Sequence, residues 1–395
     1  MRISPLRPIC SVFLLLALLL PTVRAADAAI SDDEAAQFGR SLAALFNAGK
    51  SDEVLRNIDL FALGNRGMHG LDLDDNERSE IVSGAARGLR ESMGQQFKQW
   101  TSSRFIRVNE VAGEKRVFLR VVSAAGMFNF FDIVCARKAA GGLKAVDVFI
   151  LLSGELMSAT LRRSVLPAVL EQKKGMLERL VSTESEQMKA MPTLQQGTAA
   201  LLKGEYATAL AAFESLPREV QTPQFVLQLR LQAAQRCGEQ QCLKVIEEWE
   251  RNYPGDPTLD MVSIDGCFLR KDFSGASRHL ESLQIRTGPD GYLEIMRALM
   301  LKLDGRPVEA VKAVKHALAV EPSLTKAYDV WFDLEHSARN WPGIVAALQA
   351  FETAFPKADL WKAISSDASW ADFRESAECK AWREAKAGAT AETNP

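Results

Sequence analysis

The chain has 395 residues, of which 47% are hydrophobic and 25% are charged. This is the composition of a folded globular protein, and it excludes a disordered, collagen-like or small disulfide-framework protein. One hydrophobic core rarely grows beyond about 250–300 residues, so we expect two domains or a repeat array. The 48 basic and 50 acidic residues nearly balance, which argues against a basic surface that recruits nucleic acid.

The first 25 residues have the pattern of a secretory signal peptide. Arg2 and Arg7 supply positive charge ahead of an apolar stretch over residues 9–20, and small residues precede the expected cleavage point after Ala25. The apolar stretch is shorter than the roughly 20 residues that a membrane-spanning helix needs, so we favour cleavage over an uncleaved anchor. The sequence therefore predicts an exported protein, periplasmic or secreted, with no membrane insertion of the mature chain.

Residues 30–190 predict an α+β domain. Ser31 and Glu34 form a capping box ahead of an amphipathic helix, and Asp74 and Glu77 repeat the pattern ahead of a longer helix. Four strand-like runs, separated by glycine turns, follow these helices: 104–111, 116–123, 128–137 and 143–152. Short glycine turns connect antiparallel neighbours, so we expect helices packed on a four-stranded antiparallel sheet.

The order of elements in this domain resembles the cystatin-like and nuclear-transport-factor-like folds, in which a curved sheet wraps one helix. Some members of those folds hold a small ligand between sheet and helix, so the resemblance implies an alternative function as a carrier of a small ligand or lipid. The residues that would line such a pocket are Phe128, Phe131, Val148 and Ile150. A solid core is the other interpretation.

The second half of the chain repeats with a step of 34 residues. A first column of the repeat holds Cys242, Ala276, Ala310 and Ile344. A second column, four residues on, holds Ile246, Leu280, Val314 and Leu348. A third column holds Trp249, Leu283, Ala317 and Phe351, and a fourth holds Pro254, Gly288, Pro322 and Pro356. The first three columns mark one face of a helix, and the fourth marks the place where that helix stops.

This pattern resembles the tetratricopeptide repeat (TPR) family. Gly204, Tyr206 and Ala209 reproduce the family's Gly-x-Tyr-x-x-Ala motif, and the large Phe213 follows four positions on. The resemblance implies an all-α, TPR-like solenoid of five helix pairs over residues 191–356. An irregular helical bundle is the alternative.

The residues after the repeats predict a terminal cap. Residues 357–386 carry the large apolar anchors Trp361, Trp370 and Trp382, together with charged residues for an outer polar face. Residues 387–395 are small and polar, which favours a disordered tail.

The resemblance also implies a protein or peptide partner. Repeat arrays of this kind bind along the concave face made by the first helix of each unit. The family's groove positions correspond here to Gln224, Leu227, Leu231, Thr258, Met261, Asp265, Tyr292, Ile295, Leu299, Lys302, Lys326, Asp329 and Asp333. Because many of these side chains are apolar, they would serve equally well as core residues.

Residue types typical of catalysis or metal binding form no recognisable constellation. The four histidines are scattered and there is no Cys-x-x-Cys pair. Asp72, Asp74 and Asn76 are spaced as in a calcium loop, but Glu77 replaces the required glycine, so helix capping explains them better. We therefore expect a non-enzymatic adaptor or scaffold with no metal and no cofactor.

One disulfide is conceivable. Cys237 and Cys242 flank Gly238, between the two helices expected for unit two. In a continuous helix these residues would be about 7.5 Å apart, too far for a bridge, whereas a turn would allow the roughly 4.4–6.8 Å that a disulfide requires. Export permits a disulfide, and two buried thiols are the alternative.

Overall fold

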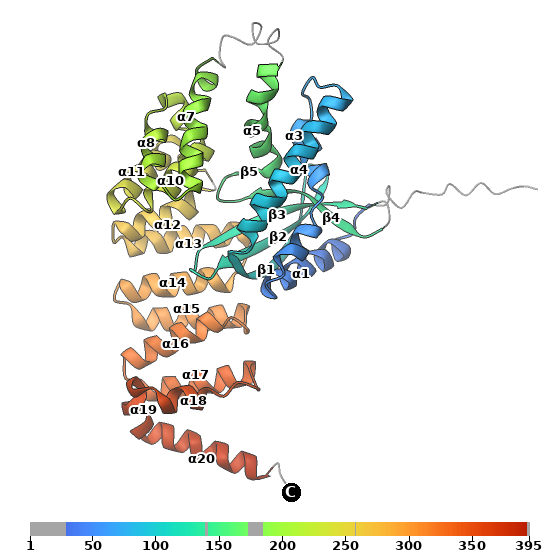
Figure 1. The fold of residues 1–395 in the computed structure, drawn as a ribbon. Coiled ribbons are helices and arrows are strands. Elements are labelled where there is room, and N and C mark those ends of the chain that lie inside the picture. Colours follow the sequence, from blue (N-terminus) through green and yellow to red (C-terminus); the bar gives the residue numbers. More distant parts are fainter. Residues whose placement is uncertain (1–28, 139–140, 173–184, 257, 393–395) are drawn as a thin grey trace, which may run out of the picture.

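The computed structural model describes residues 29–138, 141–172, 185–256 and 258–392. An N-terminal domain of helices and one sheet lies against a long stack of helices that runs to the C-terminus (Figure 1). The expected signal peptide, residues 1–25, lies outside the described residues. None of the helices in the described ranges is long and apolar enough to span a membrane.

The N-terminal domain begins with four helices and continues as an antiparallel meander. Its elements are α1 (Asp32–Asn47), α2 (Ser51–Arg56), α3 (Leu60–Met68), α4 (Asp75–Phe97), β1 (Trp100–Val111), β2 (Glu114–Ser123), β3 (Phe128–Arg137), β4 (Leu143–Ile150), β5 (Glu155–Leu156) and α5 (Met157–Gln172). The strand order is β1-β2-β3-β4-β5. The sheet has five strands where four were expected, because the chain turns back after Ile150 and pairs Glu155 with it.

Both capping boxes are confirmed. The Ser31 hydroxyl accepts the Glu34 N–H at 3.2 Å, and the Asp74 carboxylate accepts the Asn76 and Glu77 N–H groups at 2.9 Å each. Asp74 therefore caps α4, as preferred above to a calcium loop.

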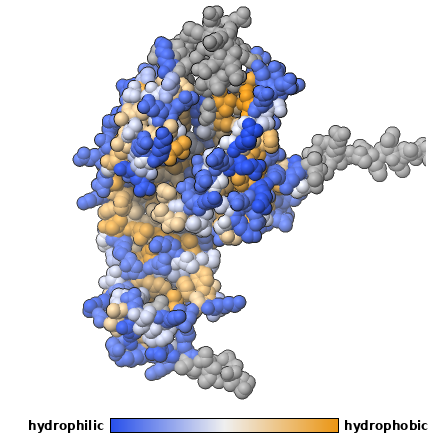
Figure 2. Space-filling view, viewed as in Figure 1, coloured by the Kyte–Doolittle hydropathy of each residue, from blue (hydrophilic) through white to orange (hydrophobic). Residues whose placement is uncertain are grey.

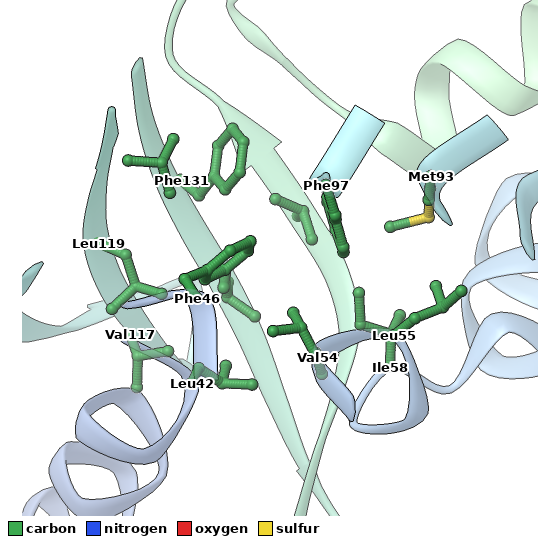
Figure 3. Packing of buried hydrophobic residues seen from close by; sticks show 14 of the residues in the cluster. Leu42, Phe46, Val54, Leu55, Ile58, Met93, Phe97, Val117, Leu119 and Phe131 are labelled. Atoms are coloured by element: carbon green, nitrogen blue, oxygen red, sulfur yellow. The ribbon is translucent and has the colours of Figure 1, made fainter. Parts of the chain in front are cut away.

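The domain core lies between one face of the sheet and helices α1, α2 and α4 (Figure 3). Leu119 and Phe131 supply the sheet side, and the rings of Phe46 and Phe97 meet edge to face with centroids 5.5 Å apart. Close-packed side chains thus fill this face of the sheet.

The second half of the described chain is a stack of antiparallel helix pairs. Its helices are α7 (Ser185–Leu202), α8 (Tyr206–Glu214), α9 (Arg218–Gln221), α10 (Gln224–Ala234), α11 (Glu239–Asn252), α12 (Leu259–Leu269), α13 (Phe273–Thr287), α14 (Gly291–Leu303), α15 (Pro307–Val320), α16 (Thr325–Ser337) and α17 (Trp341–Ala354). With the short α9 set aside, they pair as five units: α7 with α8, α10 with α11, α12 with α13, α14 with α15, and α16 with α17.

The turn inside each unit has the same backbone signature. One residue with positive φ separates the two helices of every unit, at steps of 33 or 34 residues: Gly204, Gly238, Lys271, Gly305 and Arg339. A positive φ suits glycine and strains other residues, so its recurrence at non-glycine positions shows how strongly packing fixes the turn. This regularity identifies a TPR-like repeat rather than an irregular bundle.

The sequence columns lie between paired helices. Ala209, Ala276 and Ala310 are fully buried, as are the large residues Phe213 and Val314 that follow them. A small side chain thus lets two helices approach, and a large one fills the space beside it.

A helical cap closes the stack. It contains α18 (Leu360–Ser366), a 3₁₀ turn (Ala368–Trp370), α19 (Ala371–Glu375) and α20 (Ala377–Glu392). Phe373 and Trp382 are buried in its cluster with Ile344 and Leu348 of α17. Helix α20 continues to Glu392, so the expectation of a disordered tail from residue 387 is wrong up to that point. The alanines between Ala387 and Ala391 favour helix, and residues 393–395 lie outside the described residues.

Ala310 provides a test of the repeat phase. Ala310→Trp should destabilise the protein by about 1–3 kcal/mol or more, because Ala310 is fully buried between helices and the indole overpacks the site. Lys312→Trp, at an exposed position of the same helix, should have little effect. Thermal denaturation of both variants checks the prediction, and equal losses would contradict the phase.

Candidate protein-interaction surface

The sheet is buried on both faces. Residues alternate along β2, so Val117 and Leu119 face the domain core while Phe118 and Arg120 face the other way. Every residue of β2 from Arg116 to Ser123 is nevertheless buried. The second face is therefore covered, and the solenoid covers much of it.

The centre of this interface is apolar. Phe118 and Phe130 stack with ring centroids 5.5 Å apart and an interplanar angle of 7°. They belong to one buried cluster with Met261 and Ile264 of α12 and with Leu293 of α14. The cluster therefore joins the sheet to units three and four.

The turn between β2 and β3 lies on α14. The phenol of Tyr292 donates a hydrogen bond to the Gly126 carbonyl at 2.8 Å, and its ring lies 5.8 Å from that of Phe128. Burial raises the pKa of Tyr292, which keeps the phenol protonated as a donor.

A glycine allows a second close approach. Gly154, with φ +68°, lies between β4 and β5, and a Cβ there would stand 2.8 Å from Gln224 Oε1 and 3.1 Å from a Thr258 methyl. Only a residue without a side chain fits between the sheet and helices α10 and α12 in this way.

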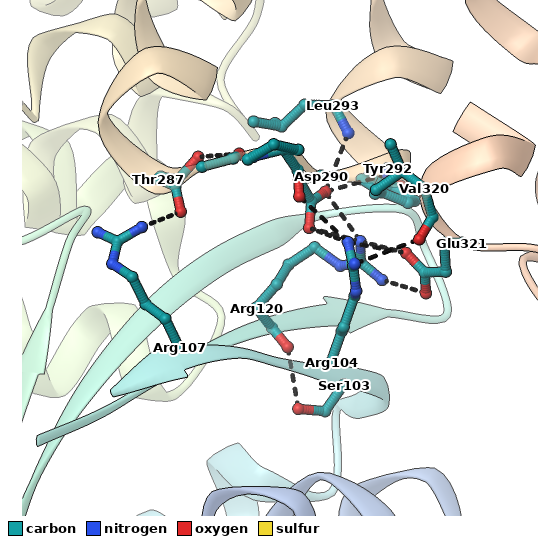
Figure 4. A network of polar contacts seen from close by, with 12 residues as sticks. Ser103, Arg104, Arg107, Arg120, Thr287, Asp290, Tyr292, Leu293, Val320 and Glu321 are labelled. Atoms are coloured by element: carbon teal, nitrogen blue, oxygen red, sulfur yellow. Dashed lines mark hydrogen bonds and ion pairs between the residues drawn. The ribbon is translucent and has the colours of Figure 1, made fainter. Parts of the chain in front are cut away.

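A buried ion cluster anchors the sheet to units four and five (Figure 4). Arg120 is fully buried and donates to both Asp290 oxygens at 2.8 Å and to the Glu321 carboxylate at 2.9 and 3.0 Å. Burial alone would lower the pKa of Arg120, but the two carboxylates more than offset it, so the pKa is raised. Asp290 also accepts the Tyr292 and Leu293 N–H groups as the N-cap of α14. One carboxylate thus starts a helix and binds the sheet.

Two further arginines contact helix ends. Arg104 of β1 donates to the carbonyls of Pro289 and Val320 at 3.3 Å each. Arg107 donates to the carbonyls of Thr287 and Arg286. The C-terminal carbonyls of a helix lack intrahelical donors and carry partial negative charge, so cations bind there favourably.

The predicted groove residues separate into three groups. The first group lies against the sheet domain or its interface cluster, and we call it the covered section: Gln224, Thr258, Met261 and Tyr292. The second group belongs to clusters inside the solenoid: Leu227, Leu231, Ile295 and Leu299. The third group keeps contact with water: Asp265, Lys302, Lys326, Asp329 and Asp333. The structure therefore does not give one continuous open groove.

The exposed residues of units four and five form what we call the open section: Lys302, Lys326, Asp329 and Asp333. Lys302 of α14 pairs with Asp333 of α16, and Lys326 lies 3.9 Å from Asp329. Exposed pairs of this kind contribute little to stability, so they can be exchanged for contacts with a partner.

Asp265 lies apart from the open section, at the far end of α12. Its side chain is open to water, yet surrounding protein atoms desolvate the carboxyl and raise its pKa to about 6. The carboxyl therefore takes up a proton in mildly acidic solution.

The residues expected to line a ligand pocket do not face one space. Phe131 and Val148 are in the core between the sheet and α1, α2 and α4, with Ile150 packed beside them. Phe128 lies on the opposite face, against Tyr292. Sheet alternation separates them, so that pocket is not present.

The considered disulfide is also absent. Cys237 and Cys242 are both free thiols, and burial raises the pKa of Cys242 to about 11. We expect alkylation of the native protein to label the half-buried Cys237 before Cys242, and unfolding without reductant to label both. A Cys237–Cys242 peptide in a non-reducing digest would contradict this arrangement.

The interface was missed in the sequence, although it left a signal there. Strand β2 reads Arg-Val-Phe-Leu-Arg-Val-Val-Ser, with apolar residues on both faces instead of one. Strands that are apolar on both faces belong to sheets covered on both sides. The identity of the covering partner is not encoded locally, because Asp290 and Glu321 lie 170 and 201 residues from Arg120.

The described residues contain no group of three or more His, Cys, Asp or Glu side chains arranged to hold a metal ion. Their largest polar cluster is the ion cluster at Arg120, which joins two domains.

Comparisons with known proteins add only distant similarities. No family model and no curated protein matches the chain. The structure described as "MamA 41-end from Desulfovibrio magneticus RS-1" is 16% identical, with 46% of this chain and 98% of that chain covered and a TM-score of 0.37. "Crystal structure of MamA protein" is 12% identical over 45% of this chain and 95% of that chain, with a TM-score of 0.36. Because these scores are low, the description as a TPR-like solenoid rests on the repeat geometry of this chain.

Proposed function

We propose that the chain is an exported, non-enzymatic scaffold that binds a protein or peptide through the open section of its concave surface. The observation that carries this proposal is the uneven use of the predicted groove. The chain's own sheet lies over the covered section, whereas Lys326, Asp329 and Asp333 remain exposed on α16.

Three features support a binding role. The solenoid presents charged side chains on neighbouring helices without intervening loops. Hydrophobic side chains reach the surface at the level of α14 and α15 (Figure 2), and Leu303 and Val308 at the turn between these helices are 50% and 70% exposed. Exposed apolar groups beside charged ones are typical of interaction surfaces.

Export is part of the proposal because the first 25 residues match a signal peptide. The mature protein should begin at Ala26 and be recovered outside the cytoplasm. Amino-terminal sequencing of the purified protein measures this directly, and an intact Met1 on most molecules would overturn it.

The binding role is tested by affinity capture with a matched pair of variants of the mature chain. The open-section variant carries Lys326→Glu, Asp329→Lys and Asp333→Lys, and the control carries Lys312→Glu on α15. We expect wild type and control to retain the same partner from the exported fraction and the open-section variant to lose it. Equal retention by all three proteins would reject the open section as the binding surface.

A further inference from the structure

The covered section has the composition of a binding site. It presents an acid pair, Asp290 and Glu321, beside the aromatic Tyr292 and the apolar Met261 and Leu293. An aromatic face and two carboxylates around one buried guanidinium are how proteins bind an arginine side chain. The guanidinium of Arg120 indeed lies 5.4 Å from the centroid of the Tyr292 ring.

The occupant of the covered section is a projecting β-hairpin. Strands β2 and β3 contribute Arg120 with Phe118 and Phe130 around it, and the turn between them contributes the Gly126 carbonyl. The solenoid thus holds this hairpin as a receptor would hold a hairpin from another protein: aromatic contacts surround one buried ion cluster.

Both sides of the contact retain cores of their own. The sheet packs on α1, α2 and α4 through Leu119, Phe131 and their neighbours. The solenoid keeps its own clusters, around Trp249 in unit two and around Trp331 in unit five. Separation of the two parts therefore breaks only the cluster that they share, which contains the charged groups that are costly to bury unpaired.

We propose that the covered section is a cryptic binding site for a β-hairpin that carries an arginine between aromatic side chains, with the chain's own β2–β3 hairpin as its built-in competitor. In the closed form the hairpin competes at an effective concentration of about millimolar, because it is tethered to the site. A partner therefore binds there only after the sheet has separated. This site is distinct from the open section, so the test below leaves the proposed scaffold role unaffected if it fails.

The test uses a synthetic peptide that spans residues 114–134 as the probe for the site. The receptors are the mature wild-type chain, Arg120→Ala, which weakens the built-in hairpin, and Arg87→Ala, which removes an exposed arginine from α4. We expect the peptide to bind Arg120→Ala at least tenfold more tightly than it binds wild type or Arg87→Ala. Adding Asp290→Ala to Arg120→Ala should abolish this gain, as should a peptide with alanine at position 120. Equal peptide affinity for all receptors would overturn the proposal.

Oxidation of methionines in the unmutated chain gives a second readout. Met261 lies in the interface cluster, Met93 in the core of the N-terminal domain, and Met127 is 53% exposed. Under dilute peroxide Met127 should oxidise first, and Met261 should follow measurably faster than Met93, because separation of the sheet exposes only Met261. Oxidation of Met261 and Met93 at one common rate would show that the interface opens only with global unfolding, and would overturn the proposal.

Discussion

Replacement of Arg120 by alanine is expected to remove about 3–5 kcal/mol from the free energy that holds the sheet on the solenoid. The guanidinium is fully buried and pairs with Asp290 and Glu321. Its loss leaves two carboxylates in a desolvated site without their cation, and removal of one partner of a buried pair carries a cost of this size. Urea denaturation should show the loss as a shift of the first unfolding transition.

A double-mutant cycle separates the contact from the general cost of mutation. Asp290→Ala should be about as costly, since it also removes the N-cap of α14. The double variant should cost less than the sum of the two by about 1–3 kcal/mol, the usual range for residues in one ion network. Asp329→Ala, at an exposed carboxylate, serves as the control and should change stability little. Strict additivity of Arg120→Ala and Asp290→Ala would mean that the two side chains do not meet.

Trp249→Ala is expected to cost about 3–5 kcal/mol. Trp249 is fully buried in the cluster that joins units two and three, with Leu216 and Val226 on one side and Val262 on the other. Its indole N–H has no hydrogen-bond partner among the described residues, so the loss comes from packing alone. Calorimetry of the variant measures it.

The control for this variant lies two residues away on the same helix. Glu247 is exposed, so Glu247→Ala should stay within about 0.5 kcal/mol of wild type. A small loss at Trp249, comparable to that at Glu247, would show that the third column of the repeat does not lie between helices.

The repeat half could be predicted because its signal is periodic. Ala276, Ala310 and their equivalents recur at a step of 34 residues, and a residue that packs between helices in one unit does so in the next. The capping residues Ser31 and Asp74 were equally predictable, since a cap depends on contacts within four residues.

The location of the binding surface could not be predicted in the same way. The family's groove positions select Tyr292 and Lys326 alike, yet only Tyr292 meets the sheet. The difference depends on contacts between residues more than 160 positions apart, such as Tyr292 with Gly126. Local pattern carries no record of such distant contacts, although the two apolar faces of β2 indicate that some cover exists.

The most direct test of the central claim, that the sheet lies on the concave surface of the solenoid, is photo-crosslinking from Met261. Photo-methionine incorporated at this position should crosslink to peptides from residues 114–134, because Met261 shares a buried cluster with Phe118 and Phe130. Mixing isotopically light and heavy protein restricts the assignment to crosslinks within one chain. Crosslinks from Met261 to residues 114–134 are the predicted result; crosslinks confined to residues 185–392 would contradict the account.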